Sequence, residues 1–101
     1  MTLTELAEKI PVMDDGELVR ALHHDNFIVR TKAICEVVKR GIDTAEAIEA
    51  IRKLGKDSTV FWNQYKVKDF ADAALELLGV QENVNKNEQV KRLVKSKLLF
   101  T

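Results

Sequence analysis

Residues 29–41 read VRTKAICEVVKRG, and residues 67–79 read VKDFADAALELLG. The two segments agree in residue type at a constant spacing, and each ends in glycine. The matched pairs are Val29 with Val67, Arg30 with Lys68, Ala33 with Ala71, Val37 with Leu75 and Gly41 with Gly79. Self-similarity of this kind is the sequence signature of a repeat architecture, so the chain is expected to contain two copies of one helical unit.

The apolar residues in both segments recur at helical spacing. This pattern predicts one amphipathic helix that ends at Gly41 and another over Ser58–Leu78 that ends at Gly79. Residues Thr59–Tyr65 could instead form a separate turn before the second helix. Each terminal glycine is suited to the left-handed conformation that closes a helix.

Capping residues predict where the other helices begin. A Thr, Asp or Asn followed three positions later by Glu can satisfy the free backbone N–H groups of a helix start. This pattern occurs at Thr2 with Glu5, Asp14 with Glu17, Asp43 with Glu46 and Asn85 with Glu88, and Asn26 or Asp25 can cap the helix that ends at Gly41. No segment alternates apolar and polar residues for long enough to predict a strand. The sequence therefore predicts an all-α protein of six helices.

Composition limits the size and the environment of the protein. A length of 101 residues favours one small domain over residues 1–101, and equal numbers of basic and acidic side chains make it near-neutral. The single cysteine, Cys35, cannot form an internal disulfide, and this favours a reducing, cytoplasmic compartment. The start of the sequence has no signal pattern, and no apolar run is long enough to cross a membrane, so no membrane association is expected.

Each copy has the same order of elements: an amphipathic helix, an acidic turn residue and a second helix. This order, together with the matched positions, resembles the HEAT-like repeats of the PBS lyase type. The resemblance implies a short α-solenoid with repeat 1 at about residues 17–41, repeat 2 at about residues 44–79, and capping helices on either side. One cap would be the C-terminal helix at about residues 86–99, because a stack of only two repeats has ends to protect.

The resemblance also implies roles for individual residues. The small Ala33 and Ala71 would allow close helix approach, and the turn aspartates Asp25 and Asp57, with Arg30 and Lys68, would tie adjacent repeats together. The second copy departs from the family pattern in two ways. It has a short insertion within Ser58–Tyr65, and it has Lys68 where arginine is commoner, so its Asp–base link is less well founded.

The candidate catalytic residues form no recognisable site. His23 and His24 would point about 100° apart on a helix, so they are poorly placed to share a metal ion. Cys35 has no evident histidine partner, and the chain lacks a phosphate-binding glycine loop and a nucleophile elbow. We therefore expect no catalytic residues, no metal and no cofactor. The HEAT-like resemblance then implies a non-catalytic protein-interaction module or adaptor that binds another protein.

Phe61, Trp62 and Tyr65 are the first candidates for partner contacts. All three lie in the insertion, and large aromatic side chains often dominate binding interfaces. The same side chains could equally fill the part of the core that the insertion opens. Basic residues near the proposed surface complete the candidate set: Arg30, Arg40, Lys91, Arg92 and Lys95.

Charge is distributed unevenly along the chain. Residues 1–17 contain one lysine and five carboxylates, a net charge of −4, whereas residues 86–101 contain five basic residues and one carboxylate, a net charge of +4. Ends of opposite sign could favour self-association, or both could be solvated caps. The basic residues also suggest an alternative function, a small nucleic-acid-binding or regulatory protein that uses Arg30, Lys39, Arg40, Lys91, Arg92 and Lys95.

Overall fold

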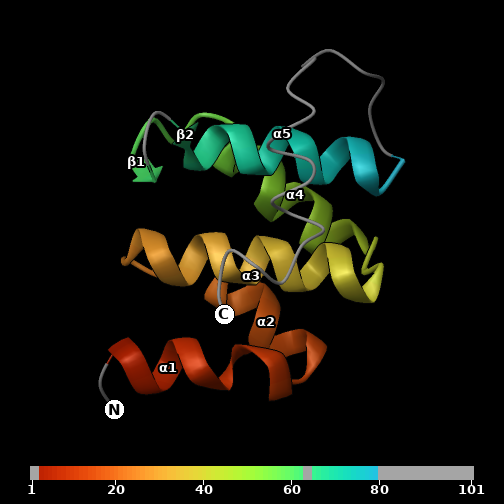
Figure 1. Ribbon diagram of the computed structural model, residues 1–101. Coiled ribbons are helices and arrows are strands. Elements are labelled where there is room, and N and C mark those ends of the chain that lie inside the picture. Colours follow the sequence, from red (N-terminus) through yellow and green to blue (C-terminus); the bar gives the residue numbers. More distant parts are fainter. Residues whose placement is uncertain (1–2, 63–64, 80–101) are drawn as a thin grey trace.

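Five α-helices account for most of the chain that this computed structural model describes, residues 3–62 and 65–79 (Figure 1). The elements in order are α1 (Leu3–Lys9), a 3₁₀ turn η1 (Ile10–Val12), α2 (Asp15–Ala21), α3 (Phe27–Arg40), α4 (Ala45–Leu54), β1 (Val60–Trp62), β2 (Tyr65–Lys66) and α5 (Val67–Leu77). The predicted helical class is confirmed. The predicted C-terminal helix at residues 86–99 lies outside the described residues.

The helices are arranged in two rows. Helices α1, α3 and α5 lie side by side with α3 in the middle, and α3 contacts both of its neighbours (Figure 1). Helices α2 and α4 contact each other, and each also packs against the long helix that follows it, α2 on α3 and α4 on α5. The two helix pairs α2–α3 and α4–α5 therefore lie next to each other.

The core lies between these rows and is mostly aliphatic. Its largest fully buried side chains include Leu18, Leu22, Val29, Ile34, Val37, Ile51, Val67 and Phe70. Ala33 in α3 and Ala71 in α5 are also fully buried. A methyl side chain at these positions leaves room for neighbouring helices to pack closely.

Most of the predicted helix ends are confirmed. The Asp14 carboxylate accepts a hydrogen bond from the Glu17 N–H at 2.8 Å, and the Asn26 side chain caps α3. Gly41 closes α3 with a φ of 67°, and Gly79 follows α5 with a φ of 76°. The predicted cap at Asp43 is wrong, because the Thr44 hydroxyl accepts the hydrogen bond at the start of α4. The caps expected at Thr2 and Asn85 lie outside the described residues.

The predicted helix over Ser58–Leu78 is wrong in its first part. The helix α5 begins only at Val67, and the strands β1 and β2 precede it as an antiparallel ribbon. The expectation that the chain contains no strand is therefore wrong at this segment, where β-branched and aromatic residues favour extended backbone.

Backbone groups of the preceding loop fix the start of α5. The Val67 N–H donates to the Thr59 carbonyl and the Lys68 N–H donates to the Asp57 carbonyl, both at 2.9 Å. The Asp69 carboxylate accepts from the Lys66 N–H. These contacts occupy the N–H groups of the first helical residues, so α5 does not extend into the ribbon.

Candidate functional site

The insertion within the second copy, between α4 and α5, forms a short ribbon that carries the three aromatic candidates. Phe61 and Trp62 lie in β1, and Tyr65 lies in β2. Trp62 and Tyr65 are direct partners in the antiparallel register, whereas Val60 pairs with Lys66 across a local irregularity. Strand β1 also contacts α3. The structure thus brings the aromatic candidates into one two-stranded ribbon at the N-terminal end of α5 (Figure 1).

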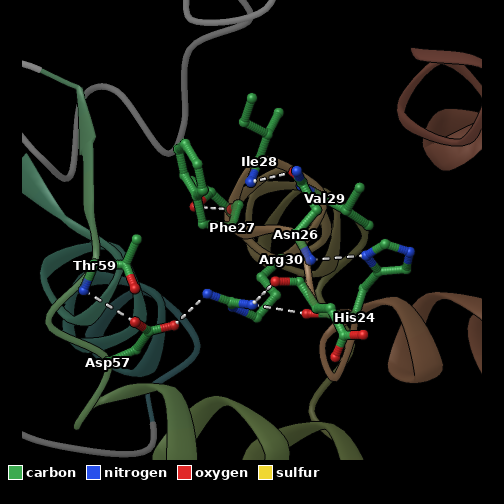
Figure 2. Close-up of polar contacts among 10 residues, drawn as sticks. His24, Asn26, Phe27, Ile28, Val29, Arg30, Asp57 and Thr59 are labelled. Atoms are coloured by element: carbon green, nitrogen blue, oxygen red, sulfur yellow. Dashed lines mark hydrogen bonds and ion pairs between the residues drawn. The ribbon is translucent and has the colours of Figure 1, made fainter. Parts of the chain in front are cut away.

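Arg30 points into the turn between the helix pairs. Its Nη2 lies 2.9 Å from Asp57 Oδ2, and its Nη1 donates to the backbone carbonyls of His24 and Asp25, each at 2.8 Å (Figure 2). The Arg30 and Asp57 side chains are only 15% and 16% exposed. The guanidinium therefore joins the α2–α3 turn to the loop that follows α4, and its three contacts are all within the chain.

Asp57 is held in its ionised form by its surroundings. Partial burial acts to raise the pKa of Asp57, but hydrogen bonding with Thr59 and the positive charge of Arg30 lower that pKa below its ordinary value. The Thr59 N–H donates to Asp57 Oδ1 at 3.0 Å (Figure 2). The carboxylate thus remains charged and paired at neutral pH.

Arg40 also forms its contacts within the chain. Its Nε donates to Glu36 at 2.9 Å and its Nη1 lies 3.2 Å from Asp15, while Nη2 donates to the Ile10 and Pro11 carbonyls. The Arg40 side chain is 22% exposed. These bonds connect the end of α3 to η1 and to the start of α2, so Arg40 supports the packing of the first helices.

The remaining basic candidates divide between the surface and the undescribed segment. Lys39 is exposed near the end of α3. Lys91, Arg92 and Lys95 lie outside the described residues, as does the rest of the positively charged C-terminal segment. The structure therefore does not place these three next to the aromatic ribbon.

His24 has a local structural role, and Cys35 is buried in the core. His24 Nδ1 accepts a hydrogen bond from the Asn26 N–H at 3.0 Å, which shapes the turn between α2 and α3 (Figure 2). Cys35 is 8% exposed, and burial raises the pKa of its thiol to about 12. Within residues 3–62 and 65–79, no three His, Cys, Asp or Glu side chains are grouped as a metal site.

A shallow groove of about 440 Å³ lies where the C-terminal ends of α2 and α4 meet. Buried apolar residues form its floor, and charged residues surround it. The lining residues are Leu22, His23, His24, Asp25, Arg30, Ala50, Lys53, Leu54, Lys56 and Asp57. Lys53 and Lys56 were not predicted as candidates, because neither belongs to a motif in the sequence. Only the packing of α2 against α4 brings them beside the α2–α3 turn.

No protein-family model, curated protein or solved structure matches this chain. Among the helices that the structure describes, none has the length and apolar character needed to cross a membrane.

Proposed function

We propose that the chain is a short HEAT-like module that works by binding another protein, without catalysis. The observation that carries this proposal is the ion pair between Arg30 of the first copy and Asp57 of the second. Asp25 and Asp57 occupy equivalent turns, and Arg30 bonds to the backbone of one and to the carboxylate of the other. This link between the two turns supports a stack of two repeated helix pairs.

The row of α1, α3 and α5 supports the same proposal (Figure 1). In a repeat protein each unit packs on its neighbours, and the stack presents a continuous surface of helices on which partners bind. The pairs α2–α3 and α4–α5 would be the two repeats, with α1 as a cap on the first. Because a fold alone does not specify a function, the proposal needs a defined contact site.

The aromatic ribbon is the proposed contact site. Phe61, Trp62 and Tyr65 lie within two paired strands, outside the helices that form the repeats. Aromatic side chains bury a large area on binding at a low cost in conformational entropy. The single cysteine keeps a reducing, cytoplasmic compartment as the proposed location.

The alternative, nucleic-acid binding, has less support. Of its basic residues, Arg30 and Arg40 donate to groups within the chain, which leaves fewer positive charges for phosphates. Self-association through ends of opposite charge also remains a proposal. Light scattering over a concentration series at low and high salt tests it, since salt would screen and weaken an interface between ends of opposite charge.

Photo-crosslinking in the native host cell tests the main proposal. The variants Trp62→p-benzoylphenylalanine and Tyr65→p-benzoylphenylalanine are expected to yield the same discrete crosslinked protein. Glu46→p-benzoylphenylalanine, at an exposed site in the first turn of α4, is the matched control and should yield none. No crosslink from either ribbon position, or the same product from all three variants, would overturn the proposed contact site.

A salt titration with random duplex DNA tests the alternative. A protein-interaction module should show no affinity for the duplex at low salt. Affinity that falls steeply as salt rises would instead favour the nucleic-acid function, because it reports the release of counterions from phosphates.

A further inference from the structure

The groove at the ends of α2 and α4 has a distinctive combination of surfaces. Its floor includes Leu22, Ala50 and Leu54, which are 0%, 2% and 9% exposed. Exposed Lys53 and Lys56 lie on the α4 side, and exposed His23 lies on the α2 side. These apolar residues are almost closed to solvent, so the charged rim supplies most of the surface that a partner could contact.

Among the residues that the structure describes, some charged side chains in this groove form an ion pair and others do not. Asp57 is paired with Arg30, so these two opposite charges largely compensate each other. In the part of the chain that the structure describes, neither Lys53 nor Lys56 has an ion pair or a side-chain hydrogen bond. Asp25 is the other carboxylate in the lining. The groove therefore has two available ammonium groups against one remaining carboxylate.

We infer that this groove binds an acidic peptide segment of the partner protein, with carboxylates beside Lys53 and Lys56. The volume of about 440 Å³ suits a few side chains. This inference rests on the proposed function and specifies the chemistry of the partner.

The two lysines also have an ordinary structural explanation. Positive side chains near the end of a helix interact favourably with its terminal carbonyl groups. That role predicts an effect of Lys53 and Lys56 on stability only. A role in recognition predicts, in addition, an effect on peptide binding that depends on the sign of the peptide charge.

Fluorescence anisotropy with a labelled peptide separates these roles. The probe is the peptide Glu-Leu-Glu-Glu-Leu carrying fluorescein, and the reference peptide has lysine in place of each glutamate. The wild-type protein should bind the acidic probe and not the reference. Lys53→Glu/Lys56→Glu should weaken binding by about tenfold, the equivalent of 1.4 kcal/mol.

The matched control is Lys9→Glu/Lys39→Glu, which changes the net charge equally at two exposed lysines outside the groove. Its affinity should stay within about twofold of wild type, well under the 1.4 kcal/mol that a tenfold change represents. Lys53→Met/Lys56→Met removes the charges without introducing repulsion, and it should also weaken binding. This second variant keeps the test valid if the glutamate variant does not fold. Urea unfolding of each variant reports stability separately.

Four results would overturn the inference: no binding of the acidic probe, equal binding of the lysine peptide, equal loss in the control variant, or unchanged binding by a folded groove variant. The crosslinking experiment at the ribbon is independent of these measurements. A ribbon crosslink without peptide binding would remove only the groove inference, whereas peptide binding without a crosslink would remove the ribbon as the contact site.

Discussion

The Arg30 guanidinium lies 2.9 Å from the Asp57 carboxylate and also donates to the Asp25 backbone carbonyl. One side chain thereby connects the turn between α2 and α3 to the loop that follows α4 (Figure 2). Because both members of the ion pair are mostly buried, this contact is expected to contribute to the relative placement of the two helix pairs.

Removing either charge of this pair should destabilise the fold. Arg30→Met and Asp57→Asn are each expected to lower the free energy of unfolding by about 1.5–3 kcal/mol, since a charged hydrogen-bonding partner is left behind. The loss of unfolding free energy in the double variant should be smaller than the sum of the two single losses by about 1 kcal/mol. The reason is that the first substitution already removes the ion pair, so the second cannot remove it again. Urea unfolding of all four proteins gives the coupling energy; strictly additive losses would contradict the importance of the pair.

The contribution of Asp57 should depend on pH. The folded-state pKa of Asp57 is lower than the ordinary value of 3.8, so between the two values the unfolded chain binds more protons than the folded one. The resulting stabilisation is complete above the ordinary pKa and is lost as the pH falls through the folded-state pKa. Wild type and Asp57→Asn should therefore differ in unfolding free energy at neutral pH and converge in acid. A gap that stays constant from neutral pH into this acidic range would contradict the prediction.

Glycine at the end of α3 is required by backbone conformation. Gly41 has a φ of 67° and no atom near the position that a Cβ would occupy, so the cost of alanine is conformational. Gly41→Ala should destabilise the protein by about 1–2 kcal/mol. Gly16→Ala, in the first turn of α2, is the control and should be neutral or stabilising by up to about 1 kcal/mol. Thermal unfolding compares the two variants, and equal effects would argue against the left-handed turn.

Arg40 should matter far more for stability than its exposed neighbour. Arg40→Met removes bonds to Glu36, Asp15 and the η1 carbonyls, and we expect a loss of about 1–3 kcal/mol. Lys39→Met changes the same charge at an exposed position and should stay within about 0.5 kcal/mol of wild type. Similar urea midpoints for the two variants would show that the Arg40 contacts contribute little in solution.

Cys35 should be protected from thiol reagents in the folded protein. The thiol is buried, and its pKa of about 12 leaves very little reactive thiolate at neutral pH. Reaction with a disulfide reagent should be at least about tenfold slower in native buffer than in denaturing urea. Absorbance of the released thiolate measures both rates, and rapid labelling under native conditions would show that α3 opens readily.

Several features of the fold could be predicted because they depend on neighbouring residues. Asp14, Asn26 and Gly41 each act on backbone groups within a few positions along the chain. The start of α4 could not be predicted to the residue in this way. Asp43 and Thr44 are adjacent and both can cap a helix, and in the structure Thr44 is the capping residue. The ribbon was missed for a similar reason, since aromatic residues at the edge of a helical pattern fit either an extended strand or a helical turn.

The sequence by itself determined the helical class, the similarity of two segments and most helix ends, because periodicity and capping are local properties. Only the tertiary structure decided that Arg30 pairs with Asp57, that Arg40 binds within the chain and that Lys53 and Lys56 border a groove. Such contacts join residues far apart in sequence. They arise from the burial of apolar faces between helices, and local patterns do not specify how those faces are paired.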